Sequence, residues 1–234
     1  ARLTVMDLAP YAVGLTRERF VLRGLRADFV VADAEYLPFA PGAFEMIFSS
    51  GVIHHTPRTE TAAAEIVRTL RPGGQMTVMV YHRDSIWFWW NTVILLGLMM
   101  LVLNALPAAL CNRALAARPA WRDYILPPGH RLRLDDVIRA GTDFGGLQNP
   151  LSRVYTRRSA RALFPGLRDF RFVPTFQAYR SFDERPSAFT RFWRGVTDWA
   201  NARWGWFLIV HGVRPPSPVG DVSEGKGEKG GEAE

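Results

Sequence analysis

Two carboxylates follow two short apolar runs near the start of the chain. Asp7 ends a run that contains Leu3 and Val5, and Asp33 ends the run 29–32. An ionised carboxylate only accepts hydrogen bonds, so Asp7 could bind both hydroxyls of a ribose and Asp33 an exocyclic adenine amine. Ligands of parallel sheets bind at the carboxyl ends of the strands. The spacing predicts a nucleoside clamp, although each aspartate could instead cap a helix or shape a turn.

Further polar groups end the next two apolar runs. Ser49, Ser50 and Gly51 follow one of them, the pair His54-His55 comes shortly after, and Tyr81-His82 ends the other. His54 is a candidate general base, because an imidazole titrates near neutral pH. The alternative is that the two histidine rings pack locally at a helix start. No group of histidine and acidic residues has the spacing of metal ligands, so we predict no metal site.

The elements that must position these groups alternate between strand and helix. Apolar runs with strand character precede each candidate group, and helical spacing of apolar residues separates them. This order predicts a parallel sheet covered by helices on both faces. The expected strands are 2–8, 28–33, 44–49, 75–81, 169–177 (interrupted by Pro174) and 206–211; the expected helices begin at Pro10, Thr59 (ended by 71–74) and Thr156, and 182–204 is expected to be a helical insertion rich in aromatic residues.

An uncharged apolar segment interrupts this alternation. Residues 85–112 carry no charge, include the run 87–90 (WFWW), and are long enough for a transmembrane helix. Strands precede and follow the segment, and a single crossing would place parts of one sheet on opposite sides of a bilayer. A helix in the membrane interface, a re-entrant hairpin, a lid over an apolar pocket and a buried cap helix all avoid this conflict.

Composition and charge narrow the class of protein. The 234 residues are 48% apolar and 22% charged, which is enough for a sizeable core. The single cysteine, Cys111, excludes an intrachain disulfide, and a cytoplasmic location without a signal peptide is expected. Residues 113–214 carry eighteen arginines against eight acidic residues. This excess of positive charge could bind phosphates, nucleic acid or an anionic membrane face. The alternative is an arginine-rich surface of a soluble protein.

Four segments together resemble a known family. Residues 5–10 (VMDLAP), 32–39 (ADAEYLPF), 51–55 (GVIHH) and 65–74 (EIVRTLRPGG) are similar in order and spacing to the class I S-adenosylmethionine-dependent methyltransferases. Within that family the similarity is greatest to the methyltransferase-11 or quinone-biosynthesis-like branch. The resemblance is dense over residues 1–82. It implies a Rossmann-like α/β fold with a mostly parallel sheet and an antiparallel last strand.

The resemblance also implies residue roles. Asp7 would bind the cofactor ribose and Asp33 the adenine, with the backbone of Ala34. Ser50 and Gly51 would flank the methionine side, and His54 and His55 would face the acceptor. In all, the implied cofactor-binding residues are Asp7, Leu8, Asp33, Ala34, Glu35, Ser50 and Gly51, and the candidate acceptor-pocket residues are His55, Tyr81, His82, Tyr155 and Arg157, the last two of which could equally serve ordinary capping and surface packing.

The sequence departs from the family pattern at its start. The family's first strand and its glycine-rich loop are absent, and the resemblance places that strand between the strands ending at Asp7 and Ser49. Unpaired backbone groups in a buried gap are costly. We therefore expect an N-terminally truncated fragment of a longer product. Neither 72–74 nor 141–146 has the strand-loop-helix context to replace the loop.

These observations give one main functional prediction. The chain is expected to transfer methyl groups from S-adenosylmethionine to a small acceptor that is hydrophobic or lipid-linked, with peripheral membrane contact through 86–111. RNA methylation is an alternative, since arginines mixed with aromatic residues in 182–206 could stack on bases. A non-catalytic scaffold is another. The expected units are a cofactor-binding core (1–82), an apolar and basic insert (83–149), the rest of the core (150–213) and a disordered tail (214–234).

Overall fold

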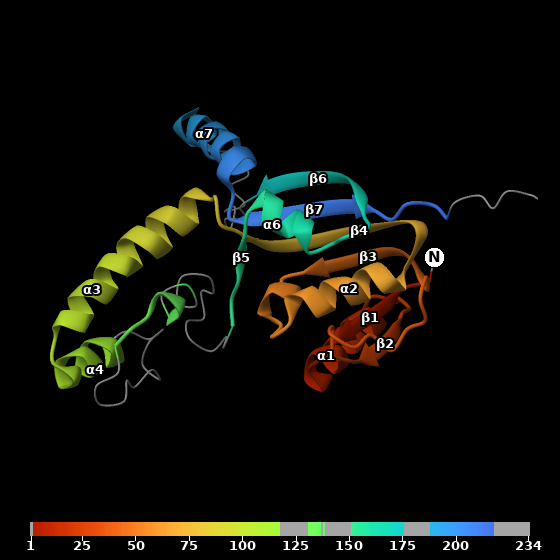
Figure 1. Cartoon of the computed structure of the whole chain (residues 1–234), viewed down its shortest axis with the longest axis horizontal. Helices are drawn as coiled ribbons and strands as arrows, with labels where there is room; N and C mark the ends of the chain where they lie inside the picture. Colours follow the sequence, from red (N-terminus) through yellow and green to blue (C-terminus); the bar gives the residue numbers. More distant parts are fainter. Residues whose placement is uncertain (1, 118–130, 137, 139–150, 176–187, 218–234) are drawn as a thin grey trace, which may run out of the picture.

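The computed structural model describes residues 2–117, 131–136, 138, 151–175 and 188–217. Over these residues the chain is an α/β structure in which most strands alternate with helices (Figure 1). In chain order the elements are β1 (Thr4–Asp7), α1 (Pro10–Leu22), β2 (Asp28–Val31), β3 (Phe44–Ser50), the short 3-10 helix η1 (Ile53–His55), α2 (Thr59–Thr69), β4 (Leu70–His82), the π-helical segment η2 (Phe88–Leu96), α3 (Gly97–Ala105), α4 (Ala108–Ala116), β5 (Val154–Tyr155), α6 (Arg157–Ala162), β6 (Arg168–Thr175), α7 (Ala188–Trp204) and β7 (Phe207–Val213).

The first two strands form a small parallel sheet. β1 pairs with β2 in the register Thr4↔Asp28 to Asp7↔Val31. α1 begins at Pro10, whose fixed backbone angle suits a first helical position. The helix packs on the sheet through an edge-to-face contact of Phe20 with Phe29, whose ring centroids are 5.4 Å apart. This unit places the carboxyl ends of β1 and β2 side by side.

The remaining strands form a five-stranded sheet in the order β3-β4-β7-β6, with β5 paired to β4. β3 and β5 run parallel to β4, whereas β7 is antiparallel to both β4 and β6. This confirms the expected mostly parallel sheet with an antiparallel last strand. α2 buries Ala62, Ala63 and Ile66 in a core that also contains Val78 and Val80 of β4.

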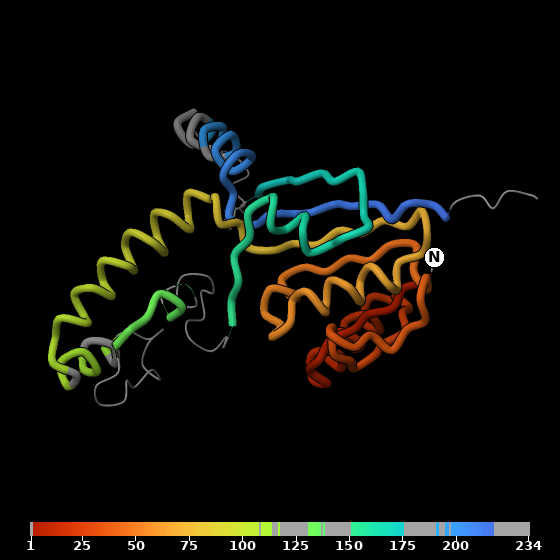
Figure 2. Tube along the Cα trace, viewed as in Figure 1, coloured from red at the N-terminus to blue at the C-terminus, as the bar shows by residue number. Residues whose placement is uncertain are grey.

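No strand pairing among the described residues joins the two sheets. In Figure 1 the group formed by β1, β2 and α1 lies on the opposite side of β3 from β6 and β7, and the trace in Figure 2 shows the same separation. At the free edge of the larger sheet, Met46 and Phe48 of β3 have 64% and 71% of their surface exposed. The break lies between β1 and β3, where the family resemblance places an additional strand.

Two expectations about strand bounds were wrong. The fourth strand was expected from residue 75, but β4 begins at Leu70, directly after α2, and includes Arg71 to Gly74. Gly73 N–H bonds to Arg214 O, and Arg214 N–H bonds to Gly74 O. Pro174 does not interrupt β6, because β6 is an edge strand where a missing N–H is tolerated. Residues 188–204 of the expected helical insertion are helical. The expectations for 141–146, 182–187 and 218–234 lie outside the described residues.

The apolar segment is a long helix followed by a turn and a second helix. η2 and α3 follow one another without a break and extend away from the sheets, and α4 follows Pro107 (Figure 1). One side packs inward through Phe88, Thr92 and Leu103. The other side, called the apolar face below, exposes large side chains: Ile86, Trp89, Trp90, Ile94, Leu95, Leu98, Leu101 and Val102. The segment is therefore not a fully buried cap helix.

Candidate active site

Asp7 and Asp33 lie at the carboxyl ends of the two parallel strands β1 and β2. The backbone N–H of Ala32 donates to the carbonyl oxygen of Asp7 at 3.1 Å, which continues the strand pairing toward Asp33. Asp7 Oδ1 accepts from the N–H of Ala9 at 2.8 Å, and Asp33 Oδ1 accepts from the N–H of Glu35 at 2.9 Å. Both turn bonds orient the carboxylates and use only one oxygen of each. The second oxygens suit the hydroxyl and amine donors of a nucleoside.

The loop after β3 begins with a glycine in a left-handed conformation. Gly51 has a φ of 74°, a backbone conformation that residues other than glycine rarely adopt. Ser50 pairs with Met79 at the end of β3, so Ser50 and Gly51 lie at the carboxyl end of their strand. A Cβ atom on Gly51 would lie 3.7 Å from the side chain of Met79, which is ordinary contact. The glycine is therefore required by its backbone angle.

Replacing Gly51 tests this requirement. We expect Gly51→Ala to lower the free energy of unfolding by about 1–2 kcal/mol, the cost of a left-handed alanine. Gly14→Ala is the matched control, because Gly14 lies inside α1 and a Cβ there meets nothing within 4 Å. The control should stabilise the chain by up to about 1 kcal/mol. Urea unfolding of both variants measures the difference, and a neutral Gly51→Ala would contradict the assignment.

His54 is fully buried in an aromatic cluster at the carboxyl ends of β3 and β4. Its ring lies 4.2 Å from those of His55 and Tyr81, and Tyr81 stacks on Trp206 at 4.6 Å. Burial, together with a smaller effect of the neighbouring His55, lowers the pKa of His54 to about 3. The backbone of Met79 opposes this only weakly, since neither ring nitrogen makes a hydrogen bond. The imidazole is therefore neutral at physiological pH.

The buried neutral histidine predicts a loss of stability in acid. The pKa of His54 is about 3 in the folded chain and near 6.5 when unfolded, so the unfolded chain binds more protons between these values. The stability that the neutral ring provides is complete above pH 6.5 and is lost as the pH falls toward 3. Linkage gives about 1.4 kcal/mol per pH unit in this window.

Urea unfolding at pH 7.5 and pH 5.0 measures this effect. We expect the free energy of unfolding to fall by about 2 kcal/mol more in the wild-type chain than in His54→Phe. His54→Gln provides a second variant in case the phenylalanine packs poorly. An identical pH dependence in the wild-type chain and in both variants would show that His54 is not responsible.

The other residues predicted for an acceptor pocket are mostly buried. His55 Nδ1 lies 2.8 Å from the carbonyl oxygen of Leu151, and His82 Nδ1 lies 3.0 Å from that of Gly205. Burial lowers the pKa of His82. Strand pairing places Tyr81 and His82 opposite residues 154–155 of β5, but only Arg157 of the predicted set is exposed. The structure thus gathers His54, His55 and Tyr81, and a pocket role for the whole set stays a prediction.

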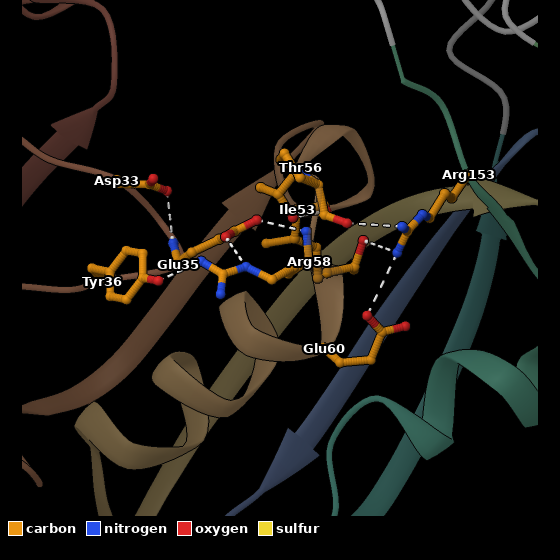
Figure 3. A network of polar contacts seen from close by, with 10 residues as sticks. Asp33, Glu35, Tyr36, Ile53, Thr56, Arg58, Glu60 and Arg153 are labelled. Atoms are coloured by element: carbon orange, nitrogen blue, oxygen red, sulfur yellow. Dashed lines mark hydrogen bonds and ion pairs between the residues drawn. The ribbon is translucent and has the colours of Figure 1, made fainter.

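Glu35 holds a position that the sequence did not reveal. Its carboxylate is buried and accepts hydrogen bonds from the backbone N–H of Arg58 at 2.6 Å and from the Arg58 Nε at 2.9 Å (Figure 3). The Arg58 guanidinium also donates to the hydroxyl of Tyr36. Glu35 therefore connects the loop after β2 to the loop after β3. The only signal in the sequence was an acidic residue next to the Asp33 motif.

A second ion pair, between Glu65 and Arg68 of α2, also holds the loop between β2 and β3. Glu65 of α2 accepts from the backbone N–H of Leu37 at 2.8 Å and pairs with Arg68 at 2.7 Å. The hydrogen bonds from Arg68 lower the pKa of Glu65. Arg68 in turn donates to the carbonyl oxygens of Phe39 and Leu37. The side chains of Glu65 and Arg68 thus bind the main chain in the middle of the loop between β2 and β3 and hold it on α2.

The first third of the chain is similar in sequence to known methyltransferases. The methyltransferase domain family matches residues 1–78. The chain is 34% identical over 83 residues to a ubiquinone/menaquinone biosynthesis C-methyltransferase, UbiE, from Brucella anthropi, covering 35% of this chain and 32% of the relative. It is 40% identical over 76 residues to a phthiotriol/phenolphthiotriol dimycocerosates methyltransferase from Mycobacterium leprae, covering 32% and 27%.

Solved structures extend the fold likeness beyond the methyltransferase domain. The YcgJ protein from Bacillus subtilis superposes with a TM-score of 0.50 at 13% identity, covering 92% of this chain and 82% of that one. A candidate methyltransferase from Bacillus halodurans gives a TM-score of 0.50 at 12% identity, covering 92% and 84%. These likenesses support a Rossmann-like methyltransferase fold. The chain spans about a third or less of the length of the two curated relatives above.

Proposed function

We propose that this protein transfers a methyl group from S-adenosylmethionine to a small apolar acceptor. The observation that supports the cofactor best is the pair Asp7 and Asp33 at one sheet edge, each with a carboxylate oriented by a local turn. Asp7 would bind the ribose hydroxyls beside Leu8, and Asp33 the adenine beside Ala34. Ser50 and Gly51, at the carboxyl end of β3, would hold the methionine part.

For this reaction the protein mainly has to position the cofactor and the acceptor and to exclude water. Bound S-adenosylmethionine would supply a methyl group on a positively charged sulfur for transfer to the acceptor. His54, with a pKa of about 3, presents a neutral and weakly basic ring. We propose it as a wall of the acceptor site, and as a base only where the acceptor reaches its nitrogen.

Calorimetry with S-adenosylhomocysteine tests the cofactor assignment without any acceptor. The 234-residue chain should be titrated with this ligand. Saturable binding of one nucleoside per chain supports the proposal. Absence of binding would contradict the roles of Asp7 and Asp33 and favour a scaffold function.

The acceptor class is supported by the apolar helix. The window Phe88–Ala105 is long and apolar enough to cross a membrane, and only 22% of it is buried. The exposed Arg113 directly follows the uncharged segment, and basic residues favour an anionic lipid surface; Arg83, before the segment, pairs with Asp84 at 3.9 Å. Two relatives are named for quinone biosynthesis and for a dimycocerosate substrate. We propose that the apolar face lies in the surface of a membrane, from which a hydrophobic or lipid-linked acceptor is taken.

A further inference from the structure

The Glu35 carboxylate joins two loops that belong to different sheets. The backbone N–H of Glu35 donates to Asp33, which follows β2 of the small sheet. Its carboxylate binds Arg58, which ends the loop that starts at Gly51 after β3 of the larger sheet. No strand pairing among the described elements holds the two sheets together. The relative position of the two sheets therefore depends on contacts of the loops, which include this one, the bonds of Glu65 and Arg68 to Leu37 and Phe39, and the packing of Ala34 on the main core.

Burial and several hydrogen bonds restrict the contact between Glu35 and Arg58 to one geometry. The side chain of Glu35 is only 5% exposed, whereas that of Arg58 is 56% exposed. A buried carboxylate without its donors is strongly unfavourable, so Glu35 keeps Arg58 in place. The guanidinium also lies 5.2 Å from the ring centre of Tyr36 and donates to its hydroxyl, which raises the pKa of Arg58. A planar guanidinium held at several points has little freedom to rotate.

We propose that Glu35 and Arg58 are positioning residues that set the distance between the two halves of the cofactor site. One half contains Asp7 and Asp33, and the other contains Ser50 and Gly51. This inference rests on the proposed function. Glu35 then acts through Asp33 and Arg58, in place of the direct cofactor contact expected from the sequence. A ligand that reaches both halves depends on the pair, and a ligand confined to one half does not.

Two probes separate these cases. Adenosine can reach only the half with Asp7 and Asp33, whereas S-adenosylhomocysteine spans both halves. We expect Glu35→Gln and Arg58→Ala to weaken S-adenosylhomocysteine binding about tenfold, the effect of one lost charge-assisted hydrogen bond. Adenosine affinity should stay within about twofold of wild type, because its half-site remains intact. Calorimetry of the full chain, by direct or competitive titration, measures both.

The matched control is Arg71→Ala, which removes an exposed ion pair with Glu45 at 2.9 Å. It should change neither affinity, since exposed pairs contribute little. Equal losses for adenosine and S-adenosylhomocysteine would indicate general destabilisation and overturn the proposal, as would no loss for either probe. Arg58→Ala leaves the buried Glu35 carboxylate without its guanidinium partner, so Glu35→Gln, which removes the buried charge, is the milder variant if Arg58→Ala does not fold.

A ligand-free readout distinguishes this inference from the proposed function. If the wild-type chain binds no S-adenosylhomocysteine, the proposed function fails, and amide hydrogen exchange still tests the pair. Exchange at residues 33–36 and 56–58 should be faster in both variants than in wild type or Arg71→Ala. Unchanged exchange there would show that Glu35 and Arg58 do not fix the two loops.

Discussion

Replacing Asp7 with alanine should reduce the affinity for S-adenosylhomocysteine by about 100-fold or more. A carboxylate that accepts from two ribose hydroxyls makes two hydrogen bonds of about 1.5–3 kcal/mol each, and about 1.4 kcal/mol corresponds to a factor of ten. The Asp7 side chain is exposed at the carboxyl end of β1, where it accepts a turn bond from the backbone N–H of Ala9. Calorimetry should therefore show a loss of affinity with little loss of fold.

Asp28→Ala is the matched control for this loss. Asp28 lies at the opposite end of the same two-stranded sheet and pairs with Arg2 at 2.7 Å in an exposed position. Its replacement removes the same charge from the same sheet and should leave the affinity within about twofold, since an exposed ion pair contributes little. If Asp28→Ala and Asp7→Ala weakened binding equally, the effect would be one of net charge, and Asp7 would not be a ribose ligand.

Replacing two residues of the apolar face should release the protein from lipid vesicles. Trp90 and Leu98 are 59% and 57% exposed on the helix formed by η2 and α3. Burial of each side chain contributes about 1.5–3 kcal/mol, so Trp90→Gln together with Leu98→Gln should lower the partition coefficient by about 100-fold or more. Flotation with vesicles that contain anionic lipid, at low salt, measures the bound fraction.

The control changes equally exposed apolar residues elsewhere. Val21 and Leu22 lie at the end of α1 with 71% and 85% of their surface exposed. The double variant Val21→Gln and Leu22→Gln loses a comparable apolar surface but should float as the wild-type chain does. Wild-type protein that stays unbound would refute the membrane proposal. Soluble wild-type dimers that the Trp90 and Leu98 variant disrupts would assign the apolar face to a second copy of the chain.

Local patterns predicted the elements around the candidate site well. The strands β1, β2 and β3 end at Asp7, Val31 and Ser50, within two residues of the ends expected from short apolar runs, and α1 begins at the predicted Pro10. The capping box that Thr156 forms with Ser159 at the start of α6 was also readable, because a cap depends on residues close in sequence. Errors arose where distant chain segments meet. Residues 71–74 join β4 because they pair with Arg214, far along the chain.

The sequence by itself determined which residues could bind a nucleoside, the alternation of strand and helix, and the apolar segment, because each depends on residue type and short spacing. Only the tertiary structure decided three other features. It buried His54, exposed one face of the apolar helix, and gave Glu35 its partner Arg58, 23 residues away. Burial and pairing depend on which segments pack together, and long-range packing is not encoded in the spacing of any single segment.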